Sequence, residues 1–267
     1  MSTATLAPTG AGTLKNTLSI ARRNLLHIKA NPEQLVEMSI QPLMFLVLFV
    51  FVFGGAIAGS SQAYLQFALP GIIVQGLAFT PFTTALGLNK DFQSGLIDRF
   101  RSLPISRSAV IAGRITADGF RILWSVLIMV GFGVVLGFRF QQPVLDVFAG
   151  AAVAMAFGLA MCWPMAFIGI TAKSPESVNT WGFMLILPLT FASSVFVPTE
   201  TMPGWLEAFV KVNPITHVVD ATRGLMLGAD AARVESVGAS ALYALLWVAG
   251  ITAVFATLTI ARYRRRV

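Results

Sequence analysis

Residues 38–89 contain no Asp, Glu, Lys or Arg over 52 consecutive positions, and this run limits what the chain can fold into. Four further uncharged runs follow, at 122–138, 147–172, 177–199 and 236–261. A helix rises about 1.5 Å per residue, so roughly 20 apolar residues cross the hydrocarbon core of a bilayer. The first run is long enough for two crossings with a break near 59–63, and each later run is long enough for one. We therefore predict an all-α membrane protein with six transmembrane helices.

The composition favours lipid over water as the medium around this chain. Hydrophobic residues make up 56% of the 267 residues, and charged residues make up only 12%. A soluble domain carries about 25% charged residues, which form the polar shell around its core. With so few charges and a mean hydropathy of +0.76, the chain is predicted to be embedded in a membrane.

The positions of the basic residues indicate which side of the membrane the loops occupy. With six crossings both termini lie on one side, and 15 of the 19 Lys and Arg residues fall in segments on that side. Because basic loops tend to stay in the cytoplasm, both termini are predicted to be cytoplasmic and the protein to lie in the cytoplasmic membrane. This asymmetry accounts for the net charge of +7, so no nucleic-acid partner is expected.

The two ends of the chain differ from its apolar middle. Residues 1–13 are small and polar and are predicted to be disordered. Residues 14–30 carry apolar side chains at steps of three or four, with the basic residues largely off that stripe, which predicts an amphipathic helix on the inner membrane surface. Residues 263–267 form a basic tail, and residues 14–262 are expected to form one transmembrane domain.

The longest segment predicted on the outer side, 191–235, is too apolar for a free loop and too interrupted by proline to cross the membrane. Two short helices within 198–228 are expected to enter the outer leaflet and return. His217, Asp220 and Arg223 are spaced by three and share a helix face, so they form either a structural ion-pair cluster, which we favour, or part of an exit gate. The candidate residues of an external gate are Phe196, Pro198, Pro203, Trp205, Asn213, Pro214, Asp220 and Arg223.

The sequence lacks the motifs through which a protein of this kind would supply its own energy or chemistry. It contains no GxxxxGK[ST] phosphate loop and no HExxH, CxxC or GxSxG motif, and two His and one Cys are too few for a metal site. None of the five uncharged runs contains an acidic residue that could couple transport to protons or sodium ions. Asp118 and Arg121 are expected to pair in the first turns of a helix that begins near Gly113. No catalytic residue and no bound cofactor are therefore predicted.

The segment DFQSGLIDRFRSLPISR, at 91–107, is a charged amphipathic stretch between two apolar runs. Placed on a helix over 91–104, its apolar side chains recur at intervals of three and four and form one face, with Asp91 as the N-cap and Pro104 as the stop. Such a helix either lies on the membrane surface and orients the protein, or serves as a lever that a cytoplasmic partner grips. The candidate residues are Asp91, Phe92, Leu96, Ile97, Asp98, Arg99, Phe100, Arg101, Leu103, Pro104 and Arg107.

Two motifs at opposite ends of the chain resemble one known family. The pattern D-x-x-x-G-x-x-D-R-F-R-S-L-P-x-S-R-x-A-x-x-x-G-R, at 91–114, is similar to the first cytoplasmic loop of ABC-2 type permeases of the daunorubicin-resistance branch. Residues 191–228 resemble the segment before the last span of that family, with its F-x-P, M-P-x-W and N-P-x-T-x-x-x-D-x-x-R elements. The resemblance extends over roughly residues 14–262.

The resemblance implies the transmembrane half of an ATP-binding-cassette exporter of amphipathic drugs or lipids. Two permease chains, identical or homologous, would join two separately encoded ATPase subunits, which bind ATP and Mg. The segment 91–107 would be the coupling helix that docks on the ATPase. Its apolar contacts would come from Phe92, Leu96, Ile97, Phe100 and Leu103, and its polar contacts from Asp98, Arg99 and Arg101. Many ABC-2 permeases have a glutamate in place of Asp98, a difference that the daunorubicin-resistance branch tolerates.

Three alternatives are compared with this hypothesis. A stand-alone secondary transporter or channel would favour acidic residues in mid-membrane, and these are missing from the uncharged runs. An intramembrane enzyme would need a nucleophile and a base, and no such pair is visible in the sequence. A wall-polysaccharide permease would share the fold, although nothing in the sequence indicates an aromatic platform for sugars.

Overall fold

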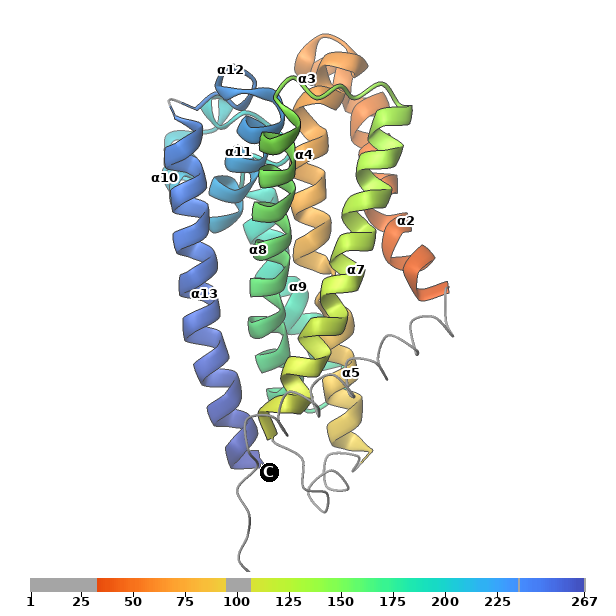
Figure 1. Cartoon of the computed structure of the whole chain (residues 1–267), viewed down its shortest axis with the longest axis vertical. Coiled ribbons are helices and arrows are strands. Elements are labelled where there is room, and N and C mark those ends of the chain that lie inside the picture. Colours follow the sequence, from red (N-terminus) through yellow and green to blue (C-terminus); the bar gives the residue numbers. More distant parts are fainter. Residues whose placement is uncertain (1–32, 95–106, 235, 267) are drawn as a thin grey trace, which may run out of the picture.

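The computed structural model describes residues 33–94, 107–234 and 236–266, and within them it contains helices and loops but no strand. Long helices run side by side along the longest axis of the molecule (Figure 1). The prediction of an all-α protein is thus confirmed. The predicted amphipathic helix at 14–30 and residues 95–104 of the predicted coupling helix lie outside the described residues.

Among the described residues, seven helices run along the bundle, and the remaining elements connect them. The seven helices are α2 (Glu33–Leu48), α4 (Ser61–Phe79), α5 (Phe82–Gln93), α7 (Arg107–Val135), α8 (Val144–Thr171), α9 (Pro175–Phe191) and α13 (Val237–Arg266). The remaining elements are a π-helix η1 (Phe49–Phe53), α3 (Gly54–Ala58), a 3-10 helix η2 (Thr199–Thr201), α10 (Gly204–Val212), α11 (Pro214–Leu227) and α12 (Ala229–Ala232).

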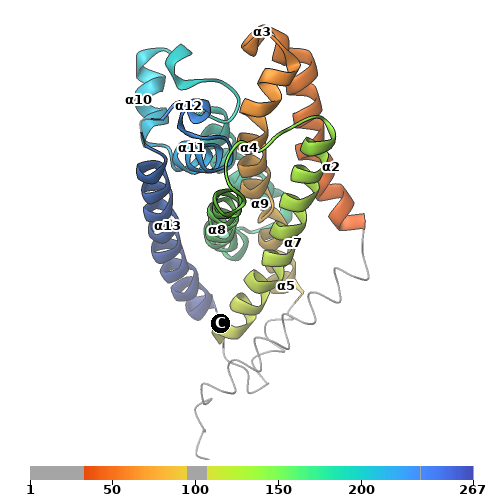
Figure 2. The same cartoon turned by 45° about the horizontal axis from the view of Figure 1, so that its top comes forward.

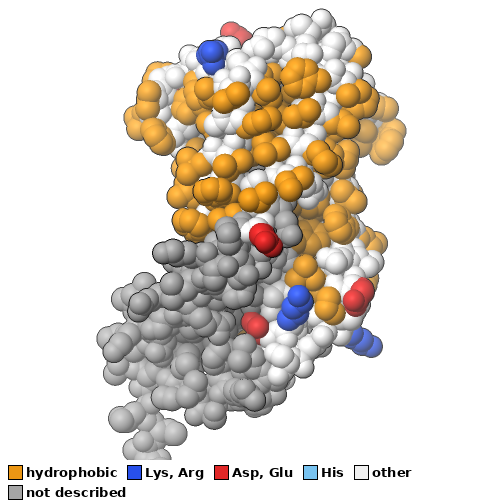
Figure 3. Space-filling view, turned by 90° about the vertical axis from the view of Figure 1, so that its right-hand side faces the viewer, with side chains coloured by type: hydrophobic (Ala, Val, Ile, Leu, Met, Phe, Trp, Pro, Cys, Tyr) orange, Lys and Arg blue, Asp and Glu red, His pale blue; other side chains and the backbone are white. Residues whose placement is uncertain are grey.

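Five stretches of the described residues are long and apolar enough to cross a membrane. They are Ser39–Ala58, Ser61–Gln93, Asp118–Val135, Val144–Thr171 and Val237–Tyr263. The remaining predicted crossing falls on α9, which has 17 residues and is shorter than each of these stretches. Side chains exposed on the spans are large and apolar, as on α13 with Leu242, Leu246 and Leu258. Figure 3 shows a broad hydrophobic band over one face, with charged side chains below it and at its upper edge.

The bundle has two distinct ends. The lower end in Figure 1 carries α5, the start of α7 and the C-terminal end of α13. The upper end carries α3, α12 and the connection from α7 to α8, and α10 and α11 lie in the same upper part of the molecule (Figures 1 and 2). Helices α10 and α11 fall within the range 198–228 where two short external helices are predicted.

Local chemistry explains the breaks between the first helices. Gly59 has a φ of 75°, a left-handed conformation that glycine adopts without steric cost, and it ends α3. Ser60 then accepts a hydrogen bond from the N–H of Ala63 and caps α4, which confirms the break predicted near 59–63. A second break separates α4 from α5 at Thr80 and Pro81, so one apolar crossing consists of two helices.

Two helix boundaries predicted from the sequence are wrong. No helix begins at Asp91, because α5 continues through Asp91 and Phe92 and ends at Gln93. Ser94 is its C-cap and donates its N–H to the carbonyl oxygen of Lys90. The change from apolar to charged residues suggests a boundary there, but charge does not stop a helix and no proline lies between Pro81 and Asp91. Helix α7 begins at Arg107 and not near Gly113, because nothing in the intervening sequence breaks it.

Helix α8 lies at the centre of the bundle and packs against α4, α5, α7, α9, α11 and α13. Small residues allow this close packing. A Cβ added at Gly158 would lie 3.2 Å from Ile122 on α7 and 3.3 Å from Leu77 on α4. The largest buried apolar side chains around α8 include Leu69, Ile72, Leu77 and Phe157. Helix packing of this kind relies on shape, because surrounding lipid is as apolar as the helix surfaces.

Candidate functional site

Two groups of buried polar side chains interrupt the apolar interior, one in each half of the bundle. We call the first the upper cluster, and it consists of Tyr64, Phe67, Ser194, Phe196, Asp220 and Arg223. We call the second the lower cluster, in which Thr84, Asn89 and Asp118 are buried, Arg121 is partly buried and Gln93 is exposed at its edge. Buried polar groups are costly unless they are paired, so each cluster marks a position where packing must be specific.

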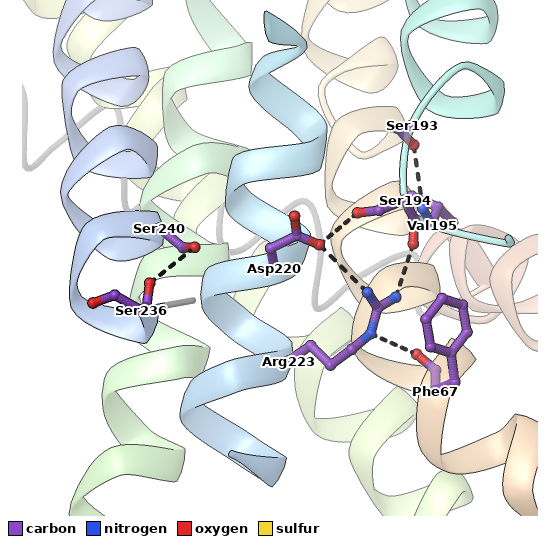
Figure 4. A network of polar contacts seen from close by, with 8 residues as sticks. All are labelled: Phe67, Ser193, Ser194, Val195, Asp220, Arg223, Ser236 and Ser240. Atoms are coloured by element: carbon purple, nitrogen blue, oxygen red, sulfur yellow. Dashed lines mark hydrogen bonds and ion pairs between the residues drawn. The ribbon is translucent and has the colours of Figure 1, made fainter. Parts of the chain in front are cut away.

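Arg223 of α11 is the centre of the upper cluster, and its side chain is only 1% exposed. Its Nε donates to the carbonyl oxygen of Phe67 on α4 at 2.9 Å, and one terminal nitrogen donates to the carbonyl oxygen of Ser194 at 2.8 Å. The other terminal nitrogen lies 3.4 Å from Oδ1 of Asp220. The guanidinium also lies 3.8 Å from the centroid of the Phe67 ring, a cation–π contact. Figure 4 shows these groups converging on one guanidinium.

The acidic partner of Arg223 is held by a second donor. The hydroxyl of Ser194 donates to Oδ1 of Asp220 at 2.7 Å. Burial raises the pKa of Asp220 above its ordinary value, while Arg223 and Ser194 oppose that shift. Burial lowers the pKa of Arg223 to about 10, so the guanidinium stays charged at neutral pH. The ion pair expected from the spacing of Asp220 and Arg223 is present, whereas the ring of His217 lies 5.4 Å from that of Tyr243 on α13.

The chain between α9 and α10 is held against α4 and α11. The hydroxyl of Tyr64 donates to the carbonyl oxygen of Phe196 at 2.8 Å. A Cβ at Gly71 would lie 2.6 Å from the carbonyl oxygen of Val195, so the two backbones are in direct contact. The amide of Asn213 donates to the carbonyl oxygens of Leu189 at 2.7 Å and Ala192 at 2.6 Å, and its oxygen caps α11. Residues 192–196, α4 and α11 are therefore joined by directional contacts.

The predicted gate residues fall into two groups. Phe196, Asn213, Asp220 and Arg223 come together around the upper cluster, and the Phe196 ring stacks on Phe49 of the π-helix at 4.2 Å. The other group lies outside this packing: Trp205 is 77% exposed, Pro203 is also exposed, Pro198 is half-buried, and Pro214 starts α11.

The lower cluster begins with Asp118 on α7, which is fully buried. The hydroxyl of Thr84 on α5 donates to Oδ2 of Asp118, and a terminal nitrogen of Arg121 lies 2.6 Å from its Oδ1. The predicted pairing of Asp118 with Arg121 is therefore present. Because α7 begins at Arg107, the pair lies about three turns inside the helix, deeper than the sequence suggested.

Asn89 on α5 forms the second part of the lower cluster and is 1% exposed. Its amide nitrogen donates to the carbonyl oxygens of Gly169 at 3.1 Å and Ala172 at 2.9 Å. These carbonyls lie at the C-terminal end of α8, where a helix leaves its last four carbonyl groups without intrahelical partners. Gln93 completes the contact, because its Nε2 donates to Oδ1 of Asn89 at 2.9 Å and to the carbonyl oxygen of Lys173 at 3.1 Å.

The comparison with known families decides what this bundle is. The sequence model of the ABC-2 type transporter family matches residues 15–227 of this chain. The chain belongs to the ABC-2 type transporter family.

Similar proteins carry permease names. The daunorubicin resistance ABC transporter permease protein DrrB1 of Streptomyces coeruleorubidus is 38% identical over 259 residues, which cover 97% of this chain and 89% of that protein. The probable doxorubicin resistance ABC transporter permease protein DrrC of Mycobacterium tuberculosis is 29% identical over 226 residues, 84% of this chain and 79% of that protein. The putative transport permease ycf38 of Cyanophora paradoxa is 28% identical over 219 residues, 77% of this chain and 72% of that protein.

These matches confirm the resemblance that the two sequence motifs indicated. The chain is a multi-pass membrane protein of an ABC permease family, with five described stretches able to cross a membrane. Both motifs of the ABC-2 permeases sit beside the clusters described above. The 91–114 motif starts at the end of α5 and lies between the α5 and α7 residues of the lower cluster, and the 191–228 motif contains most of the upper cluster.

Only the ends of the predicted coupling segment of this ABC-2 permease are described. Asp91 and Phe92 lie in the last turn of α5, and the Phe92 ring meets Tyr263 of α13 edge-on at 5.6 Å. Arg107 begins α7. The residues outside the described part are Leu96, Ile97, Asp98, Arg99, Phe100, Arg101, Leu103 and Pro104, so their role stays a prediction.

Sequence reasoning missed several residues of both clusters. Tyr64, Phe67 and Ser194 give no local signal, because their partners lie far away in the sequence. Asn89 could have been noticed, since an amide inside a long uncharged run needs a hydrogen-bond partner within the protein or at the membrane–water interface. The partner itself, the end of α8, could not have been read from the sequence.

Proposed function

We propose that this chain is the transmembrane permease subunit of an ATP-driven exporter that moves amphipathic drugs or lipids out across the cytoplasmic membrane. The observation that carries this proposal is the family match over 15–227 together with relatives named as drug resistance permeases. In this proposal the chain has no ATPase site of its own. Separate ATPase subunits bind ATP and Mg, and a second permease, identical or homologous, completes the path.

The charge distribution supports an orientation with the lower end in the cytoplasm. Exposed basic residues at that end are Lys90, Lys173, Arg262 and Arg265. The exposed basic residues of the upper part are Arg139, Lys211 and Arg233. The N-terminal segment, which lies outside the described residues, adds Lys15, Arg22, Arg23 and Lys29 to the predicted inner side. Basic residues favour the cytoplasmic side. In this orientation α9 is the fifth of six crossings, and α10 and α11 enter the membrane from outside and return.

Energy would enter at the segment 91–107. This segment follows α5 at the lower end, where a cytoplasmic ATPase would meet it, and its apolar face is suited to a groove on such a subunit. ATP-driven closure of the two ATPase subunits would then move α5 and the helices packed on it. The proposal places the cargo path between the two permeases, with membrane lipid around the outer surfaces.

Purification and reconstitution test the proposal. The tagged permease is expected to retain a separately encoded ATPase, and vesicles of the complex are expected to move daunorubicin or a fluorescent phospholipid only when ATP and Mg are supplied. Both probes are amphipathic, and the two arms distinguish drug from lipid transport. If no ATPase is retained and neither probe moves, the proposed function is wrong.

Phe100→Asp tests the coupling segment. A carboxylate on the apolar face is expected to remove ATPase binding, because burying an unpaired charge in an apolar groove is strongly unfavourable. ATP-dependent efflux should fall by about tenfold or more, since an interaction of a few kcal/mol is lost. Ser94→Asp is the control, because Ser94 is exposed and lies on the opposite side of the predicted helix. If Phe100→Asp exports at the same rate as Ser94→Asp, the segment 91–107 does not couple the permease to an ATPase.

A further inference from the structure

Helix α5 leads directly into the proposed coupling segment, and polar contacts join it to its neighbours on two sides. Thr84 contacts Asp118 of α7, and Asn89 contacts the last turn of α8. Both residues are buried: Thr84 is fully buried, and Asn89 is 1% exposed. Within an apolar bundle, such directional contacts fix the relative position of helices more firmly than apolar packing, which permits sliding.

The backbones of α5 and α8 are also in close contact near the lower end. A Cβ at Gly169 would lie 2.8 Å from the Cα of Ala85, so α5 and α8 touch directly one turn from Asn89. The two hydrogen bonds of the Asn89 amide use both of its N–H groups on two different carbonyls. Two bonds from one rigid planar group resist both translation and rotation of α5 relative to α8.

Above this contact the path of the chain is interrupted. Helix α4 ends at Phe79 and α5 begins at Phe82, with Thr80 and Pro81 between them. Proline lacks a backbone N–H, so the hydrogen-bond ladder between the two helices is incomplete at this point. Helix α4 is held instead by the upper cluster, through Tyr64 and the carbonyl of Phe67. Both helices pack on α8, but their polar contacts differ: those of α4 are with α11 and the segment 192–196, and those of α5 are with α7 and the end of α8.

We infer that Asn89 is a positioning residue for transport. Its hydrogen bonds hold α5 against the C-terminal end of α8, so that these two helix ends move as one body below the break at Thr80 and Pro81. The inference rests on the proposed function, because it concerns how movement of the coupling segment reaches the transmembrane helices. Asn89 is buried inside the bundle, so in this inference it does not itself bind ATPase or cargo. It acts through α8, which extends to the upper end and packs there on α11, where a Cβ at Gly150 would lie 3.2 Å from the carbonyl oxygen of Thr222.

The alternative is that Asn89 only satisfies the carbonyls at the end of α8 and stabilises the fold. A purely structural role predicts that a variant loses ATP hydrolysis and transport together, in proportion to the folded protein that remains. A positioning role predicts that ATP hydrolysis persists while transport falls. The two roles therefore differ in the amount of cargo moved for each ATP hydrolysed, and not in either rate alone.

Distances between spin labels test whether α5 and the end of α8 move together. The buried Cys162 is first replaced by alanine, and label pairs are placed at exposed positions 90 and 173, and at 90 and 63, in the complex with its ATPase. The 90–173 distance is expected to stay unchanged between the nucleotide-free complex and the complex with a non-hydrolysable ATP analogue. The 90–63 distance, which spans the break, is expected to shift. A 90–173 distance that changes with nucleotide overturns the inference without any Asn89 variant.

Asn89→Asp tests the residue itself. Aspartate has the same size, but it lacks the two N–H donors and places a carboxylate against two carbonyl oxygens. Daunorubicin moved per ATP hydrolysed is expected to fall by about tenfold, while ATP hydrolysis stays within about twofold of the parent chain. The 90–173 distance is then expected to vary with nucleotide.

Gln62→Glu is the matched control, because the Gln62 amide also donates to a backbone carbonyl, that of Gly137 at 2.7 Å, but does so at the exposed upper end. It should leave the transport ratio unchanged. Two outcomes would contradict the positioning role: the same amount of daunorubicin moved per ATP in Asn89→Asp and the control, or a proportional loss of transport and ATP hydrolysis in Asn89→Asp. If neither label pair responds to nucleotide and no ATPase binds, the proposed function fails, and the inference fails with it.

Discussion

Replacing Arg223 by alanine is expected to lower the free energy of unfolding by about 3–5 kcal/mol, the range for breaking a buried ion pair from one side. The substitution removes the donors to the carbonyl oxygens of Phe67 and Ser194 and the contact with the Phe67 ring. It also leaves the buried carboxylate of Asp220 without its cationic partner. Unfolding in detergent micelles, followed by circular dichroism, measures the change.

Arg233→Ala is the matched control for this experiment. Arg233 also pairs with an acid in the upper part of the protein, Glu200 at 3.1 Å, but the two side chains are 51% and 63% exposed. An exposed pair of this kind contributes about 0–1 kcal/mol, so the control is expected to unfold almost as the parent chain does. Adding Asp220→Asn to Arg223→Ala should recover part of the loss, because it removes the unpaired charge. Equal effects of Arg223→Ala and Arg233→Ala would contradict the assignment of Arg223 as the centre of the cluster.

This prediction bears on the two alternatives that the sequence left open for the Asp220–Arg223 pair. The geometry supports the structural ion-pair cluster, since Arg223 joins α11, α4 and the segment 192–196 through three separate contacts. Any opening of the outer side that kept these contacts would move the three elements as a unit. The contact of this unit with the π-helix is apolar, through the stacked rings of Phe49 and Phe196, and it has no such directional bonds.

Most of the helices could be predicted from the sequence because apolar length is a strong signal in a membrane protein. The break at Gly59 and Ser60 was also predictable, since a left-handed glycine followed by a serine cap is a local feature. The pairs Asp118–Arg121 and Asp220–Arg223 were predictable for the same reason, because residues three apart face each other on a helix. These successes all concern contacts within a few residues.

The remaining features depend on contacts between distant parts of the chain. The carbonyl oxygen of Phe67 reaches Arg223 across 156 positions, and the Asn89 amide reaches Ala172 across 83 positions. Neither partner is recognisable in the sequence, because every backbone carbonyl is an acceptor. The π-helix over Phe49–Phe53 is likewise invisible in a run of Phe and Val residues, since it reflects how that run packs and not which residues it contains.

Gly169→Ala is expected to destabilise the protein by about 1–3 kcal/mol, the usual cost of inserting a methyl group into a packed interface. The new Cβ would lie 2.8 Å from the Cα of Ala85, and backbone atoms cannot move aside as a flexible side chain can. Helices α5 and α8 must therefore separate. Gly250→Ala is the control, because a Cβ there meets nothing within 4 Å, and it should stabilise α13 by about 0.5–1 kcal/mol. Thermal unfolding of both variants in the same detergent gives the comparison, and changes of the same sign would contradict it.

The same substitution connects the packing of the two helices with the role of Asn89. The Asn89 amide lies 3.1 Å from the Gly169 oxygen and 2.9 Å from the Ala172 oxygen, so a small separation of α5 from α8 takes both acceptors out of reach. Asn89→Ala should therefore cost less stability in the Gly169→Ala background than in the parent chain. A coupling free energy of about 0.5–3 kcal/mol between the two substitutions is expected for residues that share one contact. Strictly additive effects would mean that the glycine contact and the amide contact hold α5 independently.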